Sequence, residues 1–137
     1  MDWALRPLKH YAEFDGRSPR SEYWWFFLLQ LALWTIALVP LLVAIGTAEQ
    51  SAEPGAGFWI FLVLAVVLAL GLFIPSLAVQ VRRLHDQDLS GWLVLLFFIP
   101  YVGGIIAIVF MCIRGTSGPN RFGPDPFTEE HLEGVFA

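Results

Sequence analysis

Three polar stretches carry most of the side chains in this sequence that can bind a ligand or move a proton. They span residues 14–24 (FDGRSPRSEYW), 82–92 (RRLHDQDLSGW) and 115–126 (GTSGPNRFGPDP). The planar guanidinium group of arginine suits carboxylate and phosphate oxygens, and a histidine beside an aspartate can act as an acid or base. The candidate polar cluster, or anion- and lipid-binding site, consists of Arg17, Arg20, Glu22, Arg82, Arg83, His85, Asp86, Asn120 and Arg121.

These stretches do not form a recognisable catalytic or metal-binding pattern. The order Arg-Arg-Leu-His-Asp at residues 82–86 differs from the His-Arg-Asp loop of protein kinases, and no glycine-rich loop accompanies it. His10 and His131 do not stand at metal-ligand spacing from His85. We therefore expect no catalytic residues, no metal ion and no cofactor, and no motif points to nucleic acid.

Each stretch also has a structural interpretation. Arg17 and Arg20 can lie among lipid phosphates at the edge of a membrane helix, but such a polar collar needs no acid such as Glu22. In the second stretch, Asp86 or Asp88 can pair with an arginine and act as a latch between segments. The third stretch is rich in Gly, Pro and Asn, which is typical of a defined turn.

Three apolar runs, residues 24–45, 58–81 and 92–113, must position these stretches. Each run has more than 20 residues and no charge, which is enough for a helix to cross a hydrocarbon core of about 30 Å. Only 15% of the 137 residues are charged, whereas a soluble domain has about 25%. We predict an all-α membrane protein, a small polytopic bundle of three transmembrane helices.

The third run has a second plausible form. Pro100 stands shortly before Gly103 and Gly104, and this combination can split the run into a hairpin of two shorter segments. The alternative fold then has four membrane segments. In either form, residues 1–126 make a single integral membrane domain, and residues 127–137 make an acidic, flexible tail.

The basic residues predict the orientation, because cytoplasmic loops carry an excess of Lys and Arg. Of the eight Lys and Arg residues, four precede the first run, two lie between the second and third runs, and two follow the third; residues 46–57 contain none. The N-terminus is therefore expected in the cytoplasm. Three full spans leave two arginines outside, whereas the hairpin form brings all eight to one side.

In this order and between these runs, the three stretches closely resemble the YhaH/YhaI-type family of small bacterial inner membrane proteins. The shared pattern is F-x-G-R-x-x-R-x-E-Y-W, then R-R-L-H-D-x-x-x-S-G-W, then G-x-x-G-x-N-R-F-G-x-D-P, and it extends to about Pro126. The resemblance implies a multi-pass protein of the bacterial inner (plasma) membrane. The family is a domain of unknown function, so it implies no activity and no catalytic residue.

Three functions fit the sequence. The small chain favours a non-enzymatic scaffold or partner-binding module, in contact with the bilayer and with a second copy or another membrane protein. A small transporter or channel component is an alternative, but ion-coupled carriers usually place ionisable residues within their spans. The other alternative is a site for anionic lipid headgroups built from the arginine-rich stretches, which requires all three stretches on one face of the membrane.

Overall fold

The computed structural model describes residues 4–48 and 54–127, and within them the chain is helical apart from turns and one isolated bridge. This agrees with the predicted all-α fold. Of the predicted tail, residues 127–137, all but Phe127 lie outside the described residues. The elements are α1 (Arg6–Lys9), α2 (Arg20–Ala48), α3 (Ala56–Asp86), the 3₁₀ helix η1 (Gly91–Phe98) and α4 (Gly103–Cys112).

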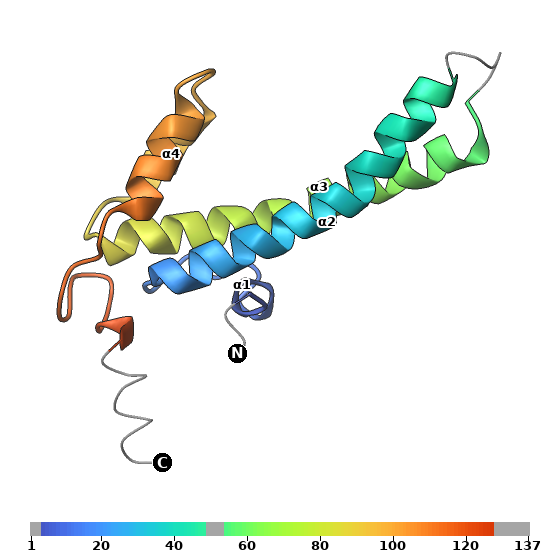
Figure 1. Ribbon diagram of the computed structural model, residues 1–137. Helices are drawn as coiled ribbons and strands as arrows, with labels where there is room; N and C mark the ends of the chain where they lie inside the picture. Colours follow the sequence, from blue (N-terminus) through green and yellow to red (C-terminus); the bar gives the residue numbers. More distant parts are fainter. Residues whose placement is uncertain (1–3, 49–53, 128–137) are drawn as a thin grey trace.

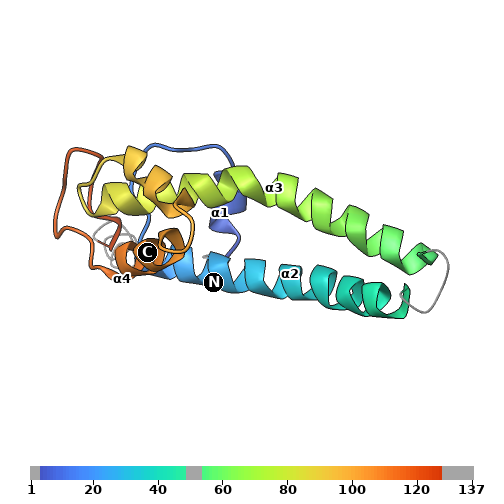
Figure 2. The same ribbon diagram turned by 90° about the horizontal axis from the view of Figure 1, so that it is seen from above.

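Helices α2 and α3 pack side by side as an antiparallel pair (Figure 2). They have 29 and 31 residues, so at 1.5 Å per residue each is about 45 Å long and can cross a membrane even when tilted. Phe26 of α2 is buried against Leu72 and Val79 of α3. Further along the pair, Ala37 and Ala65 are buried, and small residues such as these let two membrane helices approach closely.

The outward faces of this pair are apolar and exposed. Leu42 on α2 is 65% exposed, and Leu70 on α3 is 71% exposed. A soluble protein does not leave such long apolar faces in water, whereas lipid chains cover them without cost. The two long runs therefore have the surface as well as the length of membrane helices.

The third apolar run is not one helix, in contrast to the predicted bundle of three transmembrane helices. Its two halves, η1 and α4, form a hairpin that rises from the end of α3 (Figure 1). The chain reverses at residues 99–102, where Ile99 is extended, as a residue before proline prefers to be, and Tyr101 has a positive φ of 68°. The structure thus has the split form that the sequence left as the alternative.

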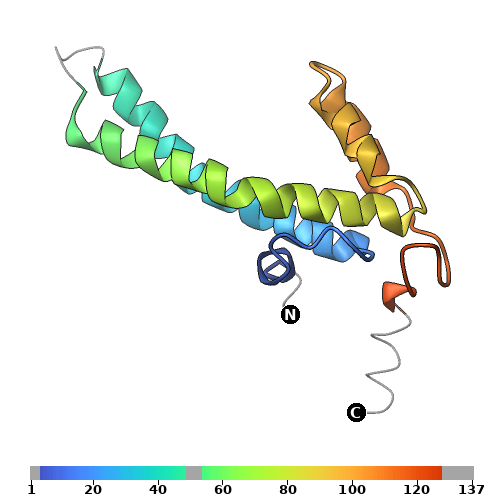
Figure 3. The ribbon, with the colours of Figure 1, turned by 180° about the vertical axis from the view of Figure 1, so that it is seen from behind.

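The hairpin is too short to span a bilayer. Eight residues of 3₁₀ helix and ten of α-helix have lengths of about 16 and 15 Å, roughly half of a 30 Å core. Seen from behind, the hairpin diverges from the long pair rather than lying along it (Figure 3). Tyr101 at its tip is 99% exposed.

The polar segments gather on one side of the molecule. In Figure 1, α1 and residues 114–127 lie in the lower part of the molecule, whereas the hairpin tip and the far ends of α2 and α3 lie in its upper part. The Tyr11 hydroxyl, just after α1, donates a hydrogen bond of 2.7 Å to the Gly71 carbonyl and holds this segment against α3. The three polar stretches therefore lie at one end of the fold.

Gly103 is required where the hairpin turns. A Cβ at this position would lie 2.1 Å from the Phe97 carbonyl oxygen, whereas a Cβ on the next residue, Gly104, would meet nothing within 4 Å. We predict that Gly103→Ala destabilises the protein by about 1–3 kcal/mol, the usual range for overpacking, and that Gly104→Ala does not. Unfolding of the two variants in detergent measures the difference, and equal stabilities would contradict the tight turn.

Candidate functional site

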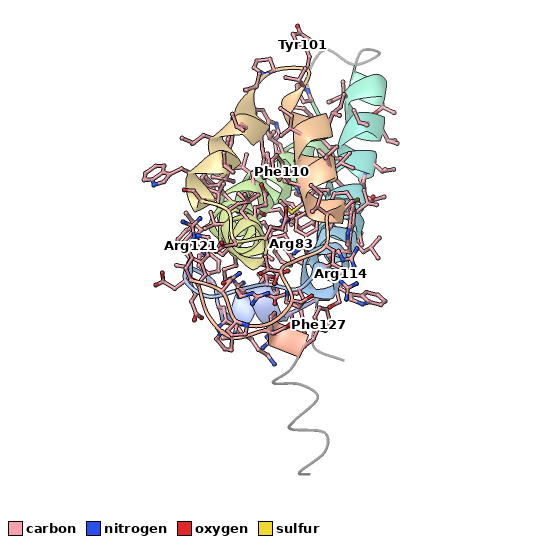
Figure 4. All side chains as sticks on the ribbon, turned by 90° about the vertical axis from the view of Figure 1, so that its left-hand side faces the viewer. Arg83, Tyr101, Phe110, Arg114, Arg121 and Phe127 are labelled. Carbon is pink, nitrogen blue, oxygen red and sulfur yellow. The ribbon has the colours of Figure 1, made fainter. Side chains whose placement is uncertain are left out.

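The three polar stretches meet where α3 ends and the hairpin begins. Figure 4 shows Arg83, Arg114 and Arg121 at this end of the molecule, opposite Tyr101 at the hairpin tip. The first stretch enters α2 here, the second leaves α3 here, and the third follows α4. Residues that are about 100 positions apart in sequence therefore become neighbours, as the contacts of Arg17 demonstrate.

Arg17 of the first stretch contacts both of the other stretches. Its Nε donates a hydrogen bond of 3.0 Å to Oδ1 of Asp86, and its Nη2 lies 2.9 Å from the same oxygen. Nη1 donates to the Gly118 carbonyl and Nη2 to the Thr116 carbonyl, both at 2.6 Å. The side chain is only 2% exposed, so these contacts replace water for a buried cation.

Asp86 is the anion at the centre of this network. Its carboxylate is 4% exposed and pairs with Arg83 as well as with Arg17. Its backbone carbonyl accepts hydrogen bonds from the Thr116 amide (2.8 Å) and hydroxyl (3.1 Å). A Cβ on Gly115 would lie 2.0 Å from Asp86 Oδ2, so only glycine lets the third stretch approach so closely.

A second buried ion pair lies beside the first. Arg82 Nη2 is 3.0 Å from Glu22 Oε1, and both side chains are almost fully buried, at 6% and 1% exposed. The Ser18 amide also donates to the Arg82 carbonyl at 3.1 Å. This pair explains the acid among the arginines of the first stretch, since Glu22 neutralises a cation of the second stretch.

The third stretch also contacts the end of α3 through Asn120 and Phe122. Asn120 Nδ2 donates hydrogen bonds of 2.9 Å to the His85 carbonyl and to the Thr116 hydroxyl. The Phe122 ring stacks on the His85 ring, with centroids 3.9 Å apart and planes within 4°. A Cβ on Gly91 would lie 3.0 Å from His85 Nε2, so this glycine leaves room for the imidazole.

The remaining candidate residues, Arg20 and Arg121, lie at the surface. Arg121 pairs with Asp88 at 3.1 Å, but both side chains are about half exposed. Arg20 is exposed, and its Nη1 donates a hydrogen bond of 3.2 Å to the Cys112 carbonyl at the end of α4. Seven of the nine candidates therefore make buried or partly buried contacts, and Arg20 and Arg121 are peripheral. The sequence alone does not distinguish the two groups.

Sequence reasoning missed several contacts that hold the hairpin. Gln87 Nε2 donates to the Phe110 carbonyl at 2.6 Å, and Arg83 donates to the Ile113 carbonyl. The acceptors are backbone carbonyls in an apolar run and give no sequence signal. In the sequence analysis, Arg114 counted only as a positive charge that predicts the orientation. In the structure, Arg114 and Arg20 both line one cavity. Within residues 4–48 and 54–127, no group of three His, Cys, Asp or Glu side chains could hold a metal ion.

Burial separates the arginines by their expected contribution to stability. Removing one partner of a buried ion pair leaves an uncompensated charge and costs about 3–5 kcal/mol, whereas an exposed pair contributes about 0–1 kcal/mol. We therefore predict a large loss for Arg17→Ala and almost none for Arg121→Ala, measured as the free energy of unfolding in detergent. Similar losses for the two variants would show that the Arg17 network does not hold the fold.

Comparison with known proteins places the chain in a family. The family described as "Protein of unknown function (DUF805)" matches residues 11–124. The protein "Inner membrane protein YhaH" of Escherichia coli (strain K12) is 44% identical over 129 residues, which cover 94% of this chain and 99% of the relative.

A second relative from the same strain, "Inner membrane protein YhaI", is 40% identical over 126 residues, which cover 92% of this chain and 96% of the relative. No solved structure matches the chain significantly. The matched residues include all the contacts of Arg17 described above, and the chain belongs to the DUF805 family of proteins of unknown function.

Proposed function

We propose that this protein is a multi-pass protein of the bacterial inner membrane that acts as a non-enzymatic scaffold or partner-binding module. In this proposal α2 and α3 cross the membrane, and the hairpin of η1 and α4 enters it to about half its depth and returns. The observation that carries the proposal is the set of contacts of Arg17 with Asp86, Thr116 and Gly118.

These contacts support an arrangement with all three polar stretches on one membrane face. If the third run crossed the bilayer, about 30 Å of hydrocarbon would separate residues 115–126 from Arg17. With a half-depth hairpin, all eight Lys and Arg residues fall on the same side, and residues 46–57 on the other side contain none. Basic residues favour the cytoplasm, so we place all three stretches there. The names of the two relatives support the inner membrane as the location.

The proposed scaffold role follows from how the charged groups are used. The carboxylates of Asp86 and Glu22 are buried and paired with arginines of the same chain. A general base or nucleophile needs a group that is free to approach a substrate. Pairing of this kind holds segments of the chain together, so in this proposal Asp86 and Glu22 have a structural rather than a catalytic role.

In this proposal the bilayer covers the exposed apolar faces of α2 and α3. A second copy of the chain, or another membrane protein, would bind within the membrane plane. Recognition of anionic headgroups is the second candidate function. It is favoured by the cavity beside Arg20 and Arg114, which is described below.

Cysteine labelling tests the proposed topology. In a Cys112→Ala background, single cysteines replace Asp15, Ser117 or Ser51, the last in the segment between α2 and α3, and an impermeant thiol reagent is applied to spheroplasts before and after lysis. We predict that Ser51→Cys reacts in intact spheroplasts, whereas Asp15→Cys and Ser117→Cys react only after lysis. Labelling of Ser117→Cys in intact spheroplasts would place the third stretch outside and refute the shared cytoplasmic site.

A further inference from the structure

We propose that the cavity between the start of α2 and the end of α4 binds the phosphate group of an anionic glycerophospholipid. The cavity has a volume of about 270 Å³, and Arg20, Arg114, Thr116 and Ser117 contribute to its lining. This assignment rests on the proposed function in one respect, because the proposed membrane arrangement places the cavity at the depth of the lipid headgroups. It adds the class of ligand and the residues that bind it.

The charges around the cavity favour an anion. The cavity is lined by the cations Arg17, Arg20 and Arg114 and by the anions Asp86 and Asp125. Asp86 is shared with a further buried cation, Arg83, so the four arginines exceed the two aspartates by two positive charges. The buried Arg17 and Arg83 share one carboxylate, and a buried cation without a counter-ion is costly. The exposed Arg20 and Arg114 add to the positive potential, which an anionic ligand would neutralise.

Asp125 lines the cavity, but its carboxylate is bound within the third stretch. Its carboxylate accepts hydrogen bonds from the amides of Gly118 (2.9 Å) and Phe127 (3.0 Å). These amides hold the pKa of Asp125 below its usual range, with a smaller contribution from nearby arginines. The carboxylate is thus committed to shaping the turn of the third stretch.

Arg20 and Arg114 have guanidinium N–H groups that can donate hydrogen bonds to a ligand. Arg17 directs its guanidinium at Asp86 and at carbonyls of the third stretch, so it contributes charge rather than donors. Arg20 uses Nη1 for the Cys112 carbonyl, and among the described residues no carboxylate pairs with Arg20 or with Arg114. Two guanidinium groups that line the same cavity as Ser117 match the several oxygens of a phosphate.

The depth of the cavity favours a lipid as the source of the phosphate. Arg20 begins α2, four residues before Trp24 at the start of an apolar run, and Arg114 follows the last apolar residue after α4. Both arginines therefore mark the boundary where headgroup phosphates lie, in a leaflet that carries anionic lipids. On the membrane side of this boundary, the exposed Ile105 and Ile108 of α4 offer an apolar surface to acyl chains.

Thermal unfolding of the purified full-length protein in a neutral detergent tests the site. Short-chain phosphatidylglycerol, short-chain phosphatidylcholine and inorganic phosphate are titrated separately, and the shift in midpoint gives an apparent Kd for each. We predict that phosphatidylglycerol raises the midpoint, that phosphatidylcholine does so much more weakly, and that inorganic phosphate does not.

Substitution of the two arginines tests which residues bind the phosphate. In the double variant Arg20→Gln/Arg114→Gln, the apparent Kd for phosphatidylglycerol should increase on the order of tenfold or more. Arg121→Gln removes an exposed arginine away from the cavity and should leave the Kd unchanged.

Three results would overturn the assignment: no shift with phosphatidylglycerol, an equal shift in the wild type and the double variant, or an equal shift with inorganic phosphate alone. The last result would show a small-anion site instead of a lipid site. If the double variant does not fold, the single variant Arg114→Gln replaces it, because this side chain is exposed and makes no ion pair among the described residues. Binding in detergent does not depend on which face of the membrane the site occupies, so failure here is separate from failure of the labelling test.

Discussion

The buried contact between Arg17 and Asp86 is the interaction on which the rest of the structure depends. A guanidinium group buried without partners would cost several kcal/mol, and its five N–H donors must all find acceptors. In this chain the acceptors come from the end of α3 and from the turn after α4, and the donor comes from the segment before α2. Burying one arginine therefore requires all three segments to be in place together.

This requirement explains how a short hairpin keeps a fixed position. Neither η1 nor α4 is long enough to span a bilayer, and lipid provides little drive for such segments to pack against the long pair. Polar contacts at the base hold them instead. Gln87 bonds to the Phe110 carbonyl, and the Thr116 amide and hydroxyl bond to the Asp86 carbonyl. These polar contacts thus fix the base of the hairpin, from which its apolar segments extend.

The sequence predicted the long helices well and the site only in part. Charge-free runs longer than 20 residues have few structural solutions in lipid, so α2 and α3 follow from composition. The third run was ambiguous, because Pro100 and the glycines after it are compatible with a kink as well as with a turn. The positive φ of Tyr101 and the close approach of Gly103 to the Phe97 carbonyl are properties of the folded hairpin.

The arginines show why the site could not be resolved further. Arg17 and Arg20 stand in the same stretch with the same chemistry, yet one is buried and the other exposed. The difference lies in carbonyls of the third stretch, about 100 residues away, and backbone acceptors carry no residue-type signal. Glu22 was the useful clue, since an acid within a basic stretch points to pairing inside the chain, and it pairs with Arg82.

A double-mutant cycle between Arg17 and Asp86 tests the central claim most directly. The free energy of unfolding in detergent is measured for the wild type, Arg17→Ala, Asp86→Ala and the double variant. If the buried pair joins the three stretches, the double variant loses less than the sum of the single losses, with a coupling of about 1.5–3 kcal/mol. Losses that add to within about 0.5 kcal/mol would show that the two residues act independently, and would contradict the account.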